Sequence, residues 1–193
     1  MKITLASTSK FKNNIFNKVG LKHYCMAPTC EEISFKTNPY EYAKELSLNK
    51  ALSIKDKAET DIVIGLDTIA YINNRIIEKP SSIEEAKNNL RESSNNITKI
   101  ISGIAIINKK TNQIINEYQE STIRFNEITE SDINYYINNE PEALNASGFI
   151  LETIMSNFID KIEGSYYNIQ GAPVEKIYSI LKEMGLNLEE INK

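Results

Sequence analysis

The sequence has no tryptophan, a single histidine and two cysteines among its 193 residues. Cys25 and Cys30 are too few for a disulfide framework and their spacing fits no zinc motif, so we interpret them as reduced thiols. One histidine, His23, leaves no material for a histidine-based metal site and little for a Ser–His relay. Any catalysis is therefore expected to depend on carboxylates, lysines and hydroxyl groups.

The sequence also lacks long apolar runs, long blocks of Lys or Arg, internal repeats and low-complexity linkers. A membrane helix needs about 20 consecutive apolar residues, and a non-specific nucleic-acid surface needs concentrated positive charge, whereas the net charge here is −4. We therefore expect a cytoplasmic protein that binds neither membranes nor nucleic acids. With 41% hydrophobic residues, an ordinary core is feasible, and we expect one domain over residues 1–193.

Helix and strand signals alternate along the chain. Ser9 is expected to cap a helix that Gly20 ends, and Asn38 with Pro39 is expected to start a longer one. The Asn73-Asn74 pair predicts a tight hairpin turn. Further predictions are strands over 2–6, 24–27, 61–70, 97–107 and 113–125, a helix with a Ser82–Glu85 capping box and Ile83, Ala86 and Leu90 on one face, a helix near Thr129, and a closing helix over 173–184. This order predicts an α/β fold with a mixed β-sheet flanked by helices.

Asp67 interrupts the apolar run Ile62-Val63-Ile64-Gly65-Leu66-Asp67-Thr68-Ile69-Ala70. A carboxylate is costly to bury unless it is paired with a cation or bound to a metal ion. Asp67 is therefore a candidate catalytic and metal-binding residue. The alternative is a strand-end aspartate that faces solvent after a bulge at Gly65.

Two lysines are further candidates. Lys50 shares an apolar stripe with residues three and four positions away, which are Ala43, Leu46 and Ile54. Its ammonium group either meets an anion there or reaches solvent along its own aliphatic stem. Lys79 precedes Pro80, which fixes the chain and directs the lysine, although most loop lysines are simply solvated.

Residues 5–12 read as a strand, a hydroxyl-rich turn and a helix start. Backbone N–H groups, the Ser7 hydroxyl and the Lys12 cation at such a helix start can form an anion site. The alternative is a plain serine-capped helix with solvated lysines. Two lysines, carboxylates and this turn together suit a polyphosphate bound with Mg²⁺, which is usually shared between carboxylates and substrate phosphates.

Several short motifs are weak signals individually, but their order and spacing along the chain are together specific. They are Leu5-Ala6-Ser7-Thr8-Ser9, Pro28-Thr29-Cys30-Glu31-Glu32, Glu45-Leu46-Ser47-Leu48-Asn49-Lys50-Ala51, Ile64-Gly65-Leu66-Asp67-Thr68, Glu78-Lys79-Pro80, Glu140-Pro141, Ala146-Ser147-Gly148-Phe149-Ile150-Leu151-Glu152, Ile162-Glu163-Gly164-Ser165-Tyr166 and Gly171-Ala172-Pro173. With these motifs the chain resembles the Maf (septum formation inhibitor) family of nucleoside triphosphate pyrophosphatases. The resemblance implies an elongated α/β fold shared with the inosine triphosphatase family, a homodimer, and hydrolysis of a nucleoside triphosphate to the monophosphate and pyrophosphate.

The resemblance also implies roles for single residues. Asp67 would be the proton acceptor, and Asp67 with Glu32 would hold a divalent cation, Mg²⁺ or Mn²⁺. Lys50 and Lys79 would neutralise charge on the leaving pyrophosphate. Ser7 and Lys12 fall on the phosphate-binding loop. The family's loop commonly reads Ser-Pro-Arg-Arg, whereas Lys12 supplies a point charge in place of a bidentate fork.

In this family three positions tune the choice of base, and here they hold Phe11, Thr68 and Glu152. The dTTP/UTP branch carries Arg, Thr and Gln, whereas the 7-methyl-GTP branch carries an aromatic residue, Gln and Glu. A glutamate can accept from guanine N1–H and N2–H₂, and an aromatic ring over a cationic base contributes about 0.5–2 kcal/mol. The sequence therefore favours 7-methyl-GTP. The alternatives are a dTTP/UTP pyrophosphatase, or a non-catalytic nucleotide-binding regulator of septum formation; Phe11 could also simply pack with Ile15.

Overall fold

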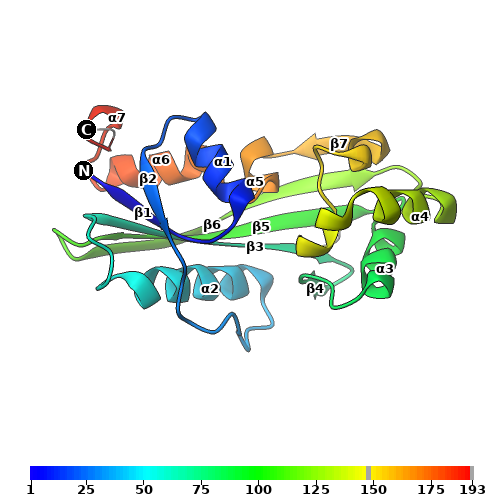
Figure 1. The fold of residues 1–193 in the computed structure, drawn as a ribbon, viewed down its shortest axis with the longest axis horizontal. Coiled ribbons are helices and arrows are strands. Elements are labelled where there is room, and N and C mark those ends of the chain that lie inside the picture. The colour runs from blue at the N-terminus through cyan, green and yellow to red at the C-terminus, as the bar shows by residue number, and fades with distance from the viewer. Residues whose placement is uncertain (147–148, 192–193) are drawn as a thin grey trace. The chain divides into compact units, whose positions relative to one another are not determined.

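The computed structural model describes residues 1–146 and 149–191, so Ser147 and Gly148 of one motif lie outside the described residues. Its strands form a seven-stranded sheet in the order β2-β1-β3-β5-β6-β7, with β4 paired to β3 (Figure 1). Their bounds are β1 Ile3–Ala6, β2 His23–Met26, β3 Ile62–Ile72, β4 Arg75–Ile77, β5 Ile97–Asn108, β6 Gln113–Phe125 and β7 Ile159–Glu163. Strand β1 pairs in parallel with β2 and β3, whereas β4 runs antiparallel to β3 and β7 antiparallel to β6. The predicted α/β class with a mixed sheet is confirmed.

The described chain forms two compact units. The first contains residues 1–68, 102–119 and 170–193, and the second contains residues 69–101 and 120–169. Across the described ranges, no helix combines the length and apolar character needed to cross a membrane.

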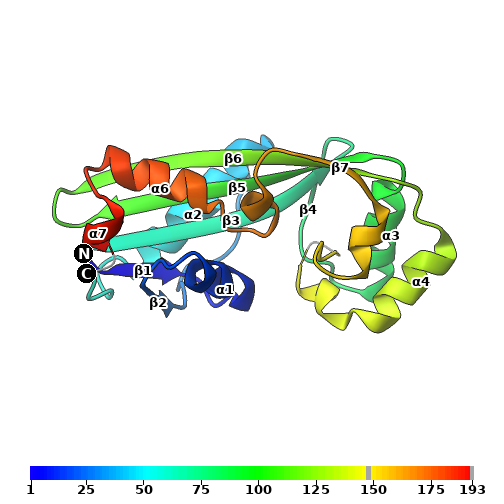
Figure 2. The ribbon, with the colours of Figure 1, turned by 90° about the horizontal axis from the view of Figure 1, so that it is seen from above.

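In the first unit, helices cover both faces of the sheet. Helix α2 (Pro39–Ile54) lies on one face, and α1 (Lys10–Lys18) and α6 (Val174–Glu183) lie on the other, with the short α7 (Leu188–Ile191) after them (Figures 1 and 2). The predicted helix starts are confirmed, because the Ser9 hydroxyl accepts from the Lys12 N–H and the Asn38 side chain accepts from the first N–H groups of α2. These caps satisfy donors that the helices leave unpaired.

Helix α2 approaches the sheet closely at two glycines. A Cβ atom on Gly65 of β3 would lie 2.0 Å from the Ser47 carbonyl oxygen, and one on Gly103 of β5 would lie 2.0 Å from the Ala43 carbonyl oxygen. Only glycine allows this approach, because any side chain would overlap the helix backbone. A cluster of small and branched residues fills the remaining contact, namely Ala6, Ala51, Ile54, Ala58, Val63, Ala105 and Ile107.

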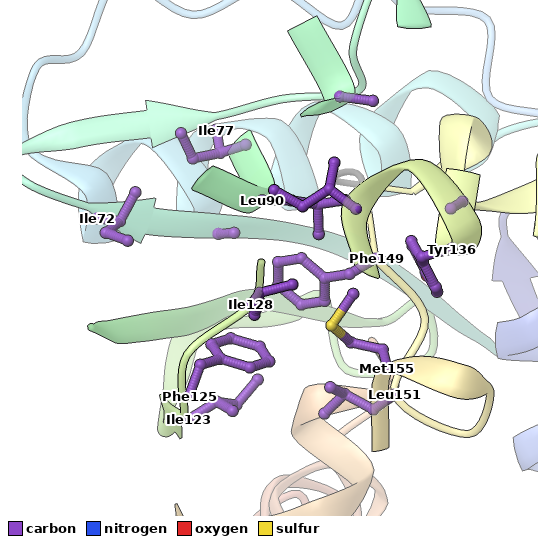
Figure 3. Packing of buried hydrophobic residues seen from close by; sticks show 14 of the residues in the cluster. Ile72, Ile77, Leu90, Ile123, Phe125, Ile128, Tyr136, Phe149, Leu151 and Met155 are labelled. Atoms are coloured by element: carbon purple, nitrogen blue, oxygen red, sulfur yellow. The ribbon is translucent and has the colours of Figure 1, made fainter. Parts of the chain in front are cut away.

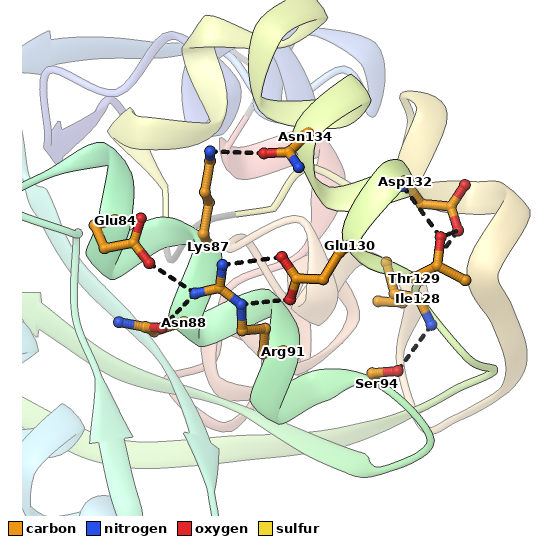
Figure 4. Close-up of polar contacts among 10 residues, drawn as sticks. All are labelled: Glu84, Lys87, Asn88, Arg91, Ser94, Ile128, Thr129, Glu130, Asp132 and Asn134. Carbon is orange, nitrogen blue, oxygen red and sulfur yellow. Dashed lines mark hydrogen bonds and ion pairs between the residues drawn. The ribbon is translucent and has the colours of Figure 1, made fainter.

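The second unit holds β4, α3 (Ile83–Ser93), α4 (Glu130–Asn139), the 3₁₀ turns η1 (Pro141–Asn145) and η2 (Ile154–Phe158), β7 and α5 (Tyr166–Ile169). Its core is aliphatic and aromatic, with the Phe125 and Phe149 rings edge to face at 5.6 Å between centroids (Figure 3). On its surface, Arg91 of α3 bridges Glu84 and Glu130 (Figure 4). The predicted start near Thr129 is confirmed by a complete capping box with Asp132.

Three local predictions have mixed outcomes. The Asn73-Asn74 turn is confirmed, with φ values of 49° and 61°. The Ser82–Glu85 capping box is half formed, because Ser82 accepts from the Glu85 N–H whereas the Glu85 carboxylate accepts from Ser81 instead. Ile83 was expected on the buried face of this helix but is exposed, because it stands in the first turn at the helix end.

Candidate functional site

The structure pairs Lys50 with Asp67 in the first unit. The Lys50 Nζ donates to Asp67 Oδ1 at 2.6 Å, and each residue is 6% exposed. The alternative of an aspartate facing solvent is therefore wrong, and so is that of a lysine reaching out to water. Gly65 pairs regularly with Ala6 in the parallel ladder, which leaves no bulge at that position.

The local fold explains how this pair forms. Side chains alternate along a strand, so Gly65 and Asp67 point to the same face of β3. Gly65 brings α2 against that face through Ser47 and Ala51. Lys50 lies between these two residues, in the same turn of the helix. The missing side chain at Gly65 thus lets a lysine of α2 reach a carboxylate two residues farther along β3.

Glu32 completes this charged group. Its Oε2 lies 3.1 Å from the Lys50 Nζ, and about half of the Glu32 side chain is exposed. The segment that carries Glu32 is hydrogen-bonded to α2 both before and after this residue. Thr29 bonds Ser53 through its N–H and its hydroxyl, and the Ser34 hydroxyl donates to the Glu45 carboxylate.

The electrostatic balance at Lys50 follows from burial and two negative neighbours. Burial lowers the pKa of the Lys50 ammonium, but the charges and hydrogen bonds of Asp67 and Glu32 outweigh that effect, so the pKa lies above its ordinary value. Lys50 is therefore charged at neutral pH. Among the described residues, Asp67 Oδ2 has no hydrogen-bond partner, since Lys50 contacts Oδ1. That oxygen can accept a proton from water or bind a cation.

The predicted phosphate-binding loop lies at the end of β1. The Ser7 hydroxyl accepts from the Ser9 N–H at 3.1 Å, which leaves the Ser7 proton for another acceptor. The Lys12 Nζ donates to the Leu66 carbonyl oxygen at 3.0 Å, next to Asp67. This carbonyl is accessible to Lys12 because the pairing of β1 with β3 ends at Ala6 and Gly65. The loop cation thus contacts the backbone of β3 one residue before Asp67.

Thr68 lies on the other face of β3 with two partners that the sequence did not indicate. Its Oγ1 is 2.8 Å from the Ser102 Oγ and 3.4 Å from the Gly171 carbonyl oxygen. Ser102 belongs to the neighbouring strand β5, and Gly171 to the segment before α6. One signal was available for Ser102, which is a hydroxyl among the mostly apolar residues 100–107 of β5.

Phe11 is the second residue of α1 and is 41% exposed, whereas Ile15 is buried. The alternative that Phe11 simply packs into the core is therefore wrong. Its ring is accessible to a ligand or to solvent.

Lys79 and Glu152 belong to the second unit. Lys79 is exposed in the segment after β4, and Glu152 is exposed in the turn before η2. Their roles in catalysis and in base choice stay predictions from the resemblance.

The carboxylates fit a metal ion that arrives with a substrate. Within residues 1–146 and 149–191, no group of three or more His, Cys, Asp or Glu side chains could hold a metal ion. Asp67 and Glu32 instead present two carboxylates around one ammonium. Mg²⁺ prefers such oxygen donors and is commonly held by one or two carboxylates plus substrate phosphates. The donor set therefore suits a cation shared with a phosphate chain.

A family model and named relatives match nearly the whole chain. The family model described as Maf-like protein matches residues 2–184. A protein named dTTP/UTP pyrophosphatase from Clostridium tetani (strain Massachusetts / E88) is 34% identical, covering 97% of this chain and 100% of that protein. One of the same name from Thermosipho melanesiensis is also 34% identical, covering 94% and 97%. The solved structure of the Staphylococcus aureus Ham1 protein has a TM-score of 0.43 and 16% identity, covering 65% of this chain and 72% of that chain. This chain belongs to the Maf-like protein family.

Proposed function

We propose that the protein is a nucleoside triphosphate pyrophosphatase. The observation that carries the proposal is the buried Lys50–Asp67 pair with Glu32 beside it. The adjacent residue Leu66 accepts from Lys12 of the predicted phosphate-binding loop. Membership of the Maf-like family and the names of the relatives support the same activity. A protein that only binds nucleotides would have no need of a buried carboxylate that can accept a proton from water.

The proposed reaction joins a water oxygen to the α-phosphorus and breaks the bond from that phosphorus to the oxygen bridging to the β-phosphate. Asp67 Oδ2 accepts the water proton, and the hydrogen bond from Lys50 to Oδ1 fixes the orientation of the carboxylate. The Ser7 hydroxyl and the Lys12 ammonium bind phosphate oxygens, and pyrophosphate leaves with the bridging oxygen. A Mg²⁺ or Mn²⁺ ion held by Asp67 and Glu32 would supply Lewis-acid stabilisation of the charge that develops.

For the base, we propose thymine or uracil. The relatives at 34% identity are named dTTP/UTP pyrophosphatases, which is the alternative to the base that the sequence favoured. Thr68 agrees with that branch in the resemblance. A second candidate is 7-methyl-GTP, which the accessible Phe11 ring favours because it is free of the core and can stack on a cationic base.

Both the proposed activity and the proposed base are tested by measuring pyrophosphate release in the presence of Mg²⁺. The substrates are dTTP, UTP, CTP, GTP and 7-methyl-GTP. Asp67→Asn keeps the shape of the side chain but removes the proton acceptor, so kcat should fall by about 10²–10⁴-fold. The matched control is Asp61→Asn, which makes the same change just before the same strand at a residue paired with Lys110 on the surface.

Equal background rates of hydrolysis in the unaltered protein and in Asp67→Asn would refute the enzyme. Nucleotide binding without turnover in the unaltered protein would favour the regulator of septum formation. A kcat/KM for 7-methyl-GTP above those for dTTP and UTP would reverse the proposed base.

A further inference from the structure

Ser102 is a buried hydroxyl with a single partner. It lies in β5 between apolar residues and is 0% exposed. In the part of the chain that the structure describes, its Oγ contacts one polar atom, the Thr68 Oγ1 at 2.8 Å. A hydroxyl without access to water loses a hydrogen bond unless it donates to a protein acceptor. Ser102 therefore donates its proton to Thr68.

This donation sets the direction of the Thr68 proton. Thr68 has one proton, and Ser102 already occupies one of the lone pairs of its oxygen. The other neighbour is the Gly171 carbonyl oxygen at 3.4 Å, which can only accept. The Thr68 hydroxyl thus points its proton away from β5 and toward the Gly171 side. At 3.4 Å this bond is long, and a better-placed acceptor can replace it.

The space beside this hydroxyl is kept open by Gly171. Its φ of +85° disfavours any other residue, and a Cβ atom there would lie 3.4 Å from Thr68 Oγ1 and 3.5 Å from the Lys12 Cε. Thr68, Gly171 and the Lys12 side chain therefore border one small space. Lys12 in turn donates to Leu66, next to Asp67.

The Lys12 ammonium donates to the Leu66 carbonyl oxygen, so the polar groups compared here are the Thr68 hydroxyl and the Gly171 carbonyl. Together these two groups suit a base better than a phosphate. The Gly171 carbonyl repels phosphate oxygens, which are acceptors like itself. An imide edge instead offers a carbonyl oxygen to the Thr68 proton and a neighbouring N–H to Gly171. Uracil and thymine present that order at O4 and N3–H, whereas cytosine presents the reverse, an amino group at position 4 and an acceptor at N3.

We propose that Ser102 is a positioning residue, which makes the Thr68 hydroxyl a hydrogen-bond donor and thereby selects uracil and thymine over cytosine. The inference rests on the proposed function, because it assumes that a pyrimidine nucleotide binds at this end of β3. It concerns binding, so it can be tested apart from hydrolysis.

The probes are the α,β-imido analogues of dUTP and dCTP, which cannot be cleaved between the α- and β-phosphorus. Calorimetry gives the ratio of their dissociation constants. The unaltered protein should favour the dUTP analogue, and Ser102→Ala should reduce that preference by about three- to tenfold, the worth of one neutral hydrogen bond. Thr68→Val should reduce it equally, and the double variant should show no further loss. Ser102→Thr keeps the hydroxyl and should keep the preference.

Ser93→Ala is the matched control, since Ser93 is also a buried serine, but in α3 of the second unit, where its hydroxyl donates to the Asn89 carbonyl oxygen. It should leave the ratio unchanged. Weaker binding of both analogues by the same factor in Ser102→Ala would indicate a merely structural role and overturn the proposal. Equal binding, or no binding, by the unaltered protein would also overturn it. A preserved dUTP preference without any hydrolysis would instead overturn the proposed function alone.

Discussion

Replacing Gly65 by alanine should move α2 away from the sheet and separate Lys50 from Asp67. The added Cβ atom would lie 2.0 Å from the Ser47 carbonyl oxygen, 2.9 Å from the Ala51 N and 3.0 Å from the Ala51 Cβ. All three atoms belong to the turn of α2 that carries Lys50. The nearest of them is backbone, so no side-chain rotation can relieve the overlap.

The size of the effect follows from these distances. Contacts under 3.0 Å are essentially never seen for Cβ atoms, so this turn of α2 must retreat by about 1 Å. The 2.6 Å bond from Lys50 to Asp67 would then exceed the range of a good hydrogen bond. Overpacking of this kind costs about 1–3 kcal/mol of unfolding free energy. A misplacement of about 1 Å at catalytic groups can cost about 10²-fold in rate.

The assay compares Gly65→Ala with Gly103→Ala. The second variant also places a Cβ atom 2.0 Å from a carbonyl oxygen of α2, that of Ala43, about two turns before Lys50, and its further contacts, with the Ala43 carbonyl carbon and the Lys44 N, are shorter than those of Gly65→Ala. Urea unfolding should show a loss of stability in Gly103→Ala at least as large as in Gly65→Ala, whereas kcat for pyrophosphate release should fall mainly in Gly65→Ala. Equal kcat values for the two folded variants would refute the claim that Gly65 places Lys50 on Asp67.

Three other predictions follow from the same group of charges. Lys50→Met leaves the Asp67 carboxylate buried without its cation, so urea unfolding should show a loss of about 3–5 kcal/mol, and much less for Lys50→Arg; equal losses in the two would contradict this. The pKa of Lys50 is raised above its ordinary 10.5, so its stabilising contribution is complete below that pH and is lost as the pH rises through the folded-state pKa. The unfolding free energy should therefore fall above about pH 10.5, and by less in Lys50→Met. Removal of divalent cations by EDTA should abolish hydrolysis, and added Mg²⁺ or Mn²⁺ should restore it; full activity in EDTA would exclude the cation.

Local signals were sufficient for much of the fold. Serine and asparagine caps, the Asn-Asn turn and the alternation of strands with helices depend on neighbours in sequence, and the structure confirms them at Ser9, Asn38 and Asn73. Strand β7 was not predicted, because Ile159-Asp160-Lys161-Ile162-Glu163 is short and its pairing with β6 contains an irregularity between Arg124 and Phe125. Such a strand depends more on its partner than on its own pattern.

In the site, too, local sequence patterns were predictable, whereas contacts between distant residues were not. Asp67 and Lys50 could be singled out because each breaks an apolar pattern that burial otherwise requires. The reason why they meet could not be read from the sequence. Gly65 was considered as a bulge, but it serves as the contact point for a helix that lies about 15 residues earlier in the chain. The Ser102–Thr68 contact depends on the register of two strands, which neither strand specifies alone.

Lys50 was predicted to act on the leaving pyrophosphate, and its geometry sets a condition for that role. An ammonium group has three protons, of which two face Asp67 and Glu32. The third has no partner among the described residues and can reach a phosphate oxygen. The Lys50 ammonium and the two carboxylates together carry one excess negative charge. The positive charge of Lys12 neutralises it but leaves no net positive charge. A triphosphate therefore gains little attraction from these groups unless a divalent cation accompanies it, so EDTA should weaken binding of the α,β-imido nucleotide as well as turnover.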